Sequence, residues 1–325
     1  MEPFVNDPSL KKAGKFNGFE ILTVEYKNVG GAGVELDVLI PDSLPANTTA
    51  PLVVRFHGGG FVTGSSLYED WFPLWVLELA AAENAIVVSA NYRLLPESTG
   101  MDMMDDLDDM WAYLHSSLPD VLKKSKIGGL GVDLERIITA GDSAGGYMSI
   151  QFALNHSEKI KACTADFPGI DLDMPPLSAP SATPPPGPTL PLTYVENHLA
   201  SSPKGTVVSS DMTLARFPLI FAMMQQGTLH KYLGTDDRLF PFRRVEKGDK
   251  LPALFVVQGR EDLLVSVESS KRFVELVKRK GAVKGGEKEL VLSVTDGGHG
   301  MSCAWGVDNE GLKEGLEMVK KVWLG

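Results

Sequence analysis

Residues 136–148 read RIITAGDSAGGYM and combine a strand pattern, a turn motif and a helix pattern. The apolar run RIITA predicts a β-strand, and the residues after Ser143 have the apolar spacing of a helix. Between the two lies Gly-Asp-Ser-Ala-Gly, which matches the G-x-S-x-G pattern of a nucleophilic serine on a sharp strand-to-helix turn. The helix start also directs backbone N–H groups at a reacting carbonyl. Taken alone, the stretch is equally compatible with a helix start rich in small residues.

A second glycine-rich motif stands upstream, where HGGGF, residues 57–61, follows the predicted strand PLVVRF. Successive glycines allow backbone N–H groups to turn into a site and donate to the oxyanion of a tetrahedral intermediate. One such donor contributes about 3 kcal/mol to stabilising the transition state. We expect the donors to be the amides of Gly59, Gly60 and Ala144, with His57 and Gly58 forming the supporting turn.

The general base and its acid are expected downstream, because the chain order in this arrangement is serine, acid, histidine. His299 lies directly after the last predicted strand, in the loop TDGGHGMS. The acid is expected after the strand ALFVVQG, where Asp262 is favoured over its neighbour Glu261. Asp296 is a weaker alternative, because it stands too close to the histidine in sequence to reach the ring. The carboxylate would fix one imidazole tautomer and stabilise the imidazolium.

Short β-branched runs alternate with helical patterns along most of the chain, which predicts an α/β protein with an open, mostly parallel, doubly wound sheet. Strands are expected at 21–26, 34–40, 51–56, 85–92, 136–140, 253–259 and 290–294, and helices at 70–82, 104–116, 144–155, 267–280 and 309–323. No internal repeat is visible, so a solenoid or propeller is not expected.

One segment breaks the alternation. Residues 171–250 contain a proline-rich loop at 174–191, followed by apolar residues at helical spacing. A long irregular stretch inside a compact domain is usually a lid or binding element. We therefore expect a single domain over residues 1–325, with 1–19 and 171–250 as cap elements within it; a disordered linker is the alternative for the second segment.

Composition excludes several classes of partner. The net charge of −11 argues against a nucleic-acid partner, since phosphate binding needs a basic surface. The N-terminus lacks the apolar core of a secretory signal, no apolar run is long enough for a membrane span, and two cysteines make no disulfide framework. We expect a cytoplasmic protein, monomeric or homodimeric, that binds a small-molecule ester or acyl substrate without a metal or organic cofactor.

These motifs, together with NYRLLPE at 91–97, resemble those of the hormone-sensitive-lipase-like family of α/β-hydrolase carboxylesterases, in the same order, over about residues 20–323. The resemblance implies the α/β-hydrolase fold with a helical cap over an acyl pocket. It also implies a triad of Ser143, Asp262 and His299 and an oxyanion hole formed by the HGGG glycines and Ala144. The chain departs from the family where Leu263-Leu264 replaces Pro-Leu after the acid, and where Tyr147 replaces an asparagine after the serine.

The function predicted from these residues is that of a serine carboxylesterase acting on small to medium apolar acyl esters. The same triad could instead serve acyl transfer, lactone opening or polyketide chain release in a biosynthetic pathway. A receptor that binds a small molecule without chemistry is a further alternative, disfavoured because His299 is retained.

Overall fold

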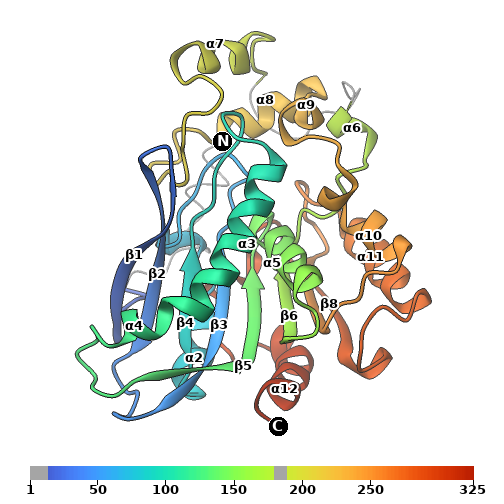
Figure 1. The fold of residues 1–325 in the computed structure, drawn as a ribbon. Helices are drawn as coiled ribbons and strands as arrows, with labels where there is room; N and C mark the ends of the chain where they lie inside the picture. The colour runs from blue at the N-terminus through green and yellow to red at the C-terminus, as the bar shows by residue number, and fades with distance from the viewer. Residues whose placement is uncertain (1–13, 179–188) are drawn as a thin grey trace.

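The computed structural model describes residues 14–178 and 189–325, and within them eight strands form one sheet in the order β1-β2-β4-β3-β5-β6-β7-β8 (Figure 1). The strands are β1 (Phe19–Val29), β2 (Ala32–Pro41), β3 (Thr49–Phe56), β4 (Ile86–Ala90), β5 (Gly131–Gly141), β6 (Ile160–Asp166), β7 (Ala253–Gly259) and β8 (Leu290–Thr295). β2 is antiparallel to both of its neighbours, whereas neighbouring strands from β4 to β8 are parallel. The mostly parallel sheet agrees with the prediction.

Helices cover both faces of the sheet, because the central strands are apolar on both sides. One apolar core lies between the sheet and α3 (Gly100–Ser116), α4 (Leu118–Leu122), α5 (Ala144–Asn155) and α11 (Val267–Arg279). The core on the opposite face involves α2 (Leu74–Ala82) and α12 (Glu310–Leu324). The sheet is therefore doubly wound, as predicted.

The order of strands reverses next to β3, which has β4 on one side and β5 on the other. In open parallel sheets, the carboxyl ends of strands at such a reversal form the crevice where ligands bind. HGGGF follows β3 and the serine turn follows β5, so the topology alone brings the two glycine-rich motifs together.

The strand β6 is missed by sequence analysis. Its sequence, IKACTAD, contains three small residues and two charged ones, so it lacks the β-branched run that marks the other strands. The strand forms because it is hydrogen-bonded between β5 and β7, and all but one of its residues are buried.

Two helix starts also differ from the expected positions, each because of a local signal. α2 begins at Leu74, since the extended backbone of Phe72 and Pro73 separates it from the short 3₁₀ turn before it. α3 begins at Gly100 because Thr99 and Asp102 form a capping box, each side chain accepting a hydrogen bond from the backbone N–H of the other residue.

The predicted cap segment contains α6 (Pro175–Ser178), α7 (Tyr194–Ser201), α8 (Pro218–Gln226), α9 (Leu229–Leu233), η3 (Asp237–Leu239) and α10 (Pro241–Lys247). Figure 1 shows α6 to α9 above the carboxyl ends of β5 and β6. Residues 1–13 and 179–188, which belong to the predicted cap elements and proline loop, lie outside the described residues. That these elements act as a cap stays a prediction.

One of the contacts between the predicted cap segment and the rest of the chain is made by a buried carboxylate. Glu97 accepts from Arg216 Nη2 at 2.6 Å and lies 2.7 Å from His198 Nε2, two residues of the cap segment. Burial pushes the pKa of Glu97 upward, but the hydrogen bonds from Arg216 and His198 outweigh it and hold the pKa at about 2. The carboxylate therefore stays ionised, and the attachment holds, through the neutral range.

Candidate active site

Ser143 stands at the turn between β5 and α5, with a left-handed backbone (φ 55°, ψ −117°). A non-glycine residue in a sparsely populated region costs about 1–3 kcal/mol and persists only when its surroundings enforce it. The glycines on either side provide the room: a Cβ at Gly141 would collide with the carbonyl of Gly145, and one at Gly145 would collide with the carbonyl of Phe56. The strand-to-helix turn predicted from G-x-S-x-G is therefore present.

Three of the predicted site residues form one hydrogen-bonded row. His299 Nε2 lies 3.0 Å from Ser143 Oγ, and His299 Nδ1 lies 2.8 Å from Asp262 Oδ2. The other carboxylate oxygen of Asp262 accepts from the N–H groups of Leu264 and Val265, both at 2.9 Å. A carboxylate held this way keeps the proton of the imidazole on Nδ1, which leaves Nε2 to accept the serine proton.

The two alternative acids lie elsewhere. Glu261 accepts from the N–H of Gly297 at 2.6 Å and thereby braces the loop that carries His299. Asp296 is exposed and pairs with Arg260 at 3.1 Å. Among the described residues, neither carboxylate bonds the imidazole, so the geometry favours Asp262 over both.

The HGGG turn lies against the serine turn. Gly59 and Gly60 have φ values of 115° and 61°, and together with Ala144 they line the cavity above Ser143. A Cβ on Gly60 would stand 2.9 Å from Ile220 of α8, so only glycine fits beneath this helix without a shift. The three residues whose amides are the expected donors therefore line the same cavity as Ser143.

His57 supports this turn. Its ring stacks on Tyr92 with 4.5 Å between centroids, and its Nδ1–H donates to the Gly58 carbonyl at 2.7 Å. Burial lowers the pKa of His57 to about 3, so the imidazole is neutral in the physiological range. This geometry agrees with the expected structural role of His57 in the turn.

Sequence reasoning missed a buried ion pair that joins the two motifs. Arg55, the penultimate residue of β3, donates to Asp142 Oδ1 at 2.7 Å, and the N–H of Gly58 donates to Asp142 Oδ2 at 3.0 Å. Both charged side chains are fully or almost fully buried. The sequence does contain a signal for this pair. Arg55 is a charged residue in the otherwise apolar strand before HGGG, and Asp142 is a charged residue among small residues directly before the serine. Breaking such a buried pair by removing one partner costs about 3–5 kcal/mol.

A cavity opens directly over Ser143 and His299. Its volume is about 140 Å³, and its walls come from the loops after β3, β5, β6, β7 and β8 and from helices that include α8 and α11. Most of the lining is apolar, including Trp71, Phe167, Phe217, Phe221 and Met224. Such a cavity suits an apolar group beside the reacting carbonyl.

Beneath the site lies a buried carboxylate that the predicted chemistry does not use. Asp166, the last residue of β6, accepts from Trp75 Nε1 at 3.0 Å and from Ser302 Oγ at 2.5 Å, both at Oδ2. Its Oδ1 has no hydrogen-bond partner within residues 14–178 and 189–325. Burial raises the pKa of Asp166 from 3.8 to about 7.

This raised pKa predicts that the free energy of unfolding depends on pH. Because the folded chain holds the Asp166 proton more tightly than the unfolded chain, stability is lost as pH rises from about 4 to about 7. Asp166→Asn keeps the acceptor oxygen but does not ionise. Its free energy of unfolding should therefore rise relative to that of the wild type as the pH increases through this window, by up to about 4 kcal/mol. Urea unfolding at pH 5 and pH 8 measures the difference, with the exposed Asp42→Asn as matched control. Parallel profiles for wild type and Asp166→Asn would show that Asp166 does not titrate in this range.

In the part of the chain that the structure describes, no cluster of three or more His, Cys, Asp and Glu side chains could hold a metal ion. No described helix is long and apolar enough to cross a membrane.

Comparisons with known proteins identify the family. The chain matches the family described as alpha/beta hydrolase fold over residues 53–284. It is 30% identical over 319 residues to the probable carboxylesterase M8 of Phoma sp., a match that covers 95% of this chain and 98% of that protein. The chain therefore belongs to the α/β-hydrolase-fold family, and the resemblance found in its motifs is confirmed.

Two further similarities add detail. A segment of the non-reducing polyketide synthase Preu6 of Preussia isomera is 25% identical over 350 residues, which covers 97% of this chain and 15% of that protein. Among solved structures, the hyperthermophilic esterase from the archaeon Pyrobaculum calidifontis aligns with a TM-score of 0.57 at 23% identity, covering 94% of this chain and 84% of the esterase chain. The second similarity confirms the predicted fold class.

Proposed function

We propose that this α/β-hydrolase is a serine carboxylesterase that hydrolyses small to medium apolar acyl esters. The observation that carries the proposal is the row from Asp262 through His299 to Ser143, which ends at the floor of a mostly apolar cavity. The similarity to a probable carboxylesterase along nearly the whole of both chains supports the same activity.

In the first half of the reaction, Ser143 Oγ attacks the ester carbonyl carbon while His299 Nε2 takes the hydroxyl proton. Asp262 stabilises the imidazolium that forms. The tetrahedral intermediate then collapses, its bond to the alcohol oxygen breaks, and His299 returns the proton to the leaving alkoxide. Ser143 is left as an acyl ester.

In the second half, water replaces the alcohol. His299 takes a proton from the water, the hydroxide attacks the acyl carbonyl, and the bond to Ser143 Oγ breaks as His299 returns the proton to it. In both halves the negative charge on the carbonyl oxygen faces the amides of Gly59, Gly60 and Ala144. The Arg55–Asp142 pair holds these amides in register with Ser143, because Asp142 bonds Gly58 while standing next to the serine.

A chain-length series tests this proposal. With p-nitrophenyl esters from acetyl to dodecanoyl, we expect kcat/KM to be highest for the short and medium acyl groups, because the cavity is apolar but bounded by α8. The release of p-nitrophenol gives the rate for each ester. A protein that hydrolyses none of the series would contradict the proposal, and a steady rise to dodecanoyl would contradict its small-to-medium acyl range.

A second candidate is acyl transfer or polyketide chain release by the same triad. The observation that favours it is the similarity between nearly all of this chain and a segment of a polyketide synthase. In that reaction an alcohol, a thiol or an internal hydroxyl replaces water in the second half. Repeating the p-nitrophenyl assay with added alcohol or thiol and analysing the products separates the two candidates, since free acid as the only product in every case excludes transfer to these acceptors.

A further inference from the structure

One polar side chain in the cavity has no partner. Ser269, in the first turn of α11, lines the cavity and is only 1% exposed. Its hydroxyl makes no hydrogen bond to any residue that the structure describes. Buried polar groups are nearly always paired, and leaving one unpaired costs about 1–3 kcal/mol. A molecule bound in the cavity could supply the hydrogen-bond partner that this hydroxyl lacks.

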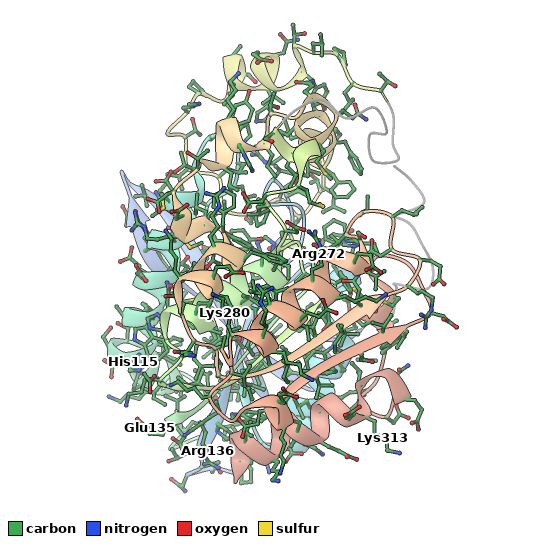
Figure 2. All side chains as sticks on the ribbon, turned by 90° about the vertical axis from the view of Figure 1, so that its right-hand side faces the viewer. His115, Glu135, Arg136, Arg272, Lys280 and Lys313 are labelled. Carbon is green, nitrogen blue, oxygen red and sulfur yellow. The ribbon has the colours of Figure 1, made fainter. Side chains whose placement is uncertain are left out.

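The surroundings of Ser269 supply a second polar group. Asp171, on the loop after β6, lines the same cavity and is almost fully buried. Its carboxylate is held by the guanidinium of Arg272, which stands one helical turn after Ser269 on α11. The ion pair connects Asp171 to the same helix that carries Ser269, and both residues line one cavity. Figure 2 labels Arg272 near the middle of the view, below the upper helices.

The chemistry of the two groups selects what they bind. A carboxylate only accepts hydrogen bonds, so a group that faces Asp171 must donate one. A serine hydroxyl both donates and accepts, so it can complete the pair with the oxygen of that same group. An alcohol or phenol hydroxyl satisfies both, whereas a methyl group satisfies neither and a ligand carboxylate would meet the charge of Asp171.

We propose that Ser269 and Asp171 form a subsite for a hydroxyl group that the ester substrate carries away from its ester bond. This inference rests on the proposed esterase function and narrows its substrate class to hydroxylated apolar esters. The hydroxyl belongs to the acyl half or to the alcohol half of the ester, and the experiment has one arm for each. A site with fixed polar groups discriminates strongly against the analogue that lacks the hydroxyl, because its own groups are then left unpaired.

Two matched ester series test the subsite. The acyl arm compares ethyl ω-hydroxyalkanoates of graded length with the ethyl alkanoates of equal length, and the alcohol arm compares ω-hydroxyalkyl acetates with alkyl acetates. Acid release in a pH-stat gives kcat/KM for each ester. In one arm, at the length that reaches Ser269, we expect the wild type to prefer the hydroxylated ester by about 10-fold.

Variants at Ser269 identify the residue responsible. Ser269→Ala should bring the ratio of the two kcat/KM values close to one, and Ser269→Thr, which keeps a hydroxyl, should retain most of the preference. Ser116→Ala is the matched control, an exposed serine at the far end of α3 next to His115, which Figure 2 labels low on the molecule. Thermal unfolding of each variant verifies that it is folded.

Each outcome decides the proposal. Equal rates for hydroxylated and plain esters in both arms overturn the subsite and leave the esterase function standing. A preference that persists unchanged in Ser269→Ala assigns the recognition to another group and also overturns it. If the p-nitrophenyl esters are not hydrolysed either, the esterase function fails, and the subsite fails with it.

Discussion

Replacing Ser143 with Ala is expected to lower kcat for a p-nitrophenyl ester by about 10⁶-fold, the order of magnitude typical of removing a triad serine. The alanine has no oxygen to attack the carbonyl, so no acyl-enzyme forms. The rate that remains comes from substrate binding and the oxyanion donors acting on water. The measurement is steady-state kinetics on purified variant, with enough enzyme to resolve a slow rate.

The control for this variant is its fold. Ser143 has a left-handed backbone that alanine tolerates only under constraint, so unfolding in urea must be compared with the wild type. A folded Ser143→Ala protein that retained more than a few per cent of wild-type turnover would show that another residue is the nucleophile.

Replacing Asp262 with Asn is expected to lower kcat by about 10⁴-fold, with little change in KM. The side-chain amide can present its NH₂ group to His299 Nδ1, which moves the ring proton to Nε2. The imidazole then donates to Ser143 and cannot take its proton. The volume of the side chain is unchanged, and the N–H groups of Leu264 and Val265 still find an oxygen acceptor.

The same chemical change at the two alternative acids provides the controls. Asp296→Asn alters an exposed ion pair with Arg260 and should leave kcat within about threefold of the wild type. Glu261→Gln keeps an oxygen that can accept from Gly297, so its effect should be far smaller than that of Asp262→Asn. An Asp296→Asn loss that equalled the Asp262→Asn loss would refute the choice of Asp262.

The parts of the site that sequence could predict are those set by short-range rules. Ser143 and the HGGG glycines follow apolar strands, and the backbone geometry of each turn demands glycine or a small residue at named positions. Asp262 and His299 follow β7 and β8, neighbours in the sheet whose carboxyl ends lie at the same edge. Because parallel strands align these ends, the order of motifs predicts that an acid after β7 and His299 lie near Ser143, while the choice among the neighbouring acids rests on the hydrogen bonds of the structure.

The parts that sequence could not predict depend on long-range packing. Each of Arg55 and Asp142 stands out locally as a charge, but no local pattern shows that they pair, because the contact joins a residue of β3 to one in the turn after β5. β6 forms because its neighbours provide hydrogen bonds on both sides, although its own residues have little preference for a strand.

Tyr147, a departure from the motif of the family that the sequence resembles, is explained by its contacts in the structure. Its hydroxyl donates to the Leu239 carbonyl at 2.8 Å and accepts from Gln151 at 2.9 Å, and its ring packs on Phe61. The side chain therefore ties α5 to η3 in the predicted cap segment and to the HGGGF turn. The unpaired hydroxyl of Ser269 likewise could not be predicted from sequence, because its place on the cavity wall and its lack of a partner among the described residues are visible only in the folded chain.

Covalent labelling shows whether Ser143 is an activated nucleophile. The wild type is treated with a fluorophosphonate that phosphonylates activated serines, and the adduct is located by mass spectrometry of the digested protein. We expect one adduct per chain, on the peptide that contains Ser143, and no labelling of Ser143→Ala. A folded wild-type protein that stays unlabelled, as a receptor without an activated serine would, or an adduct on a different residue, would contradict this expectation.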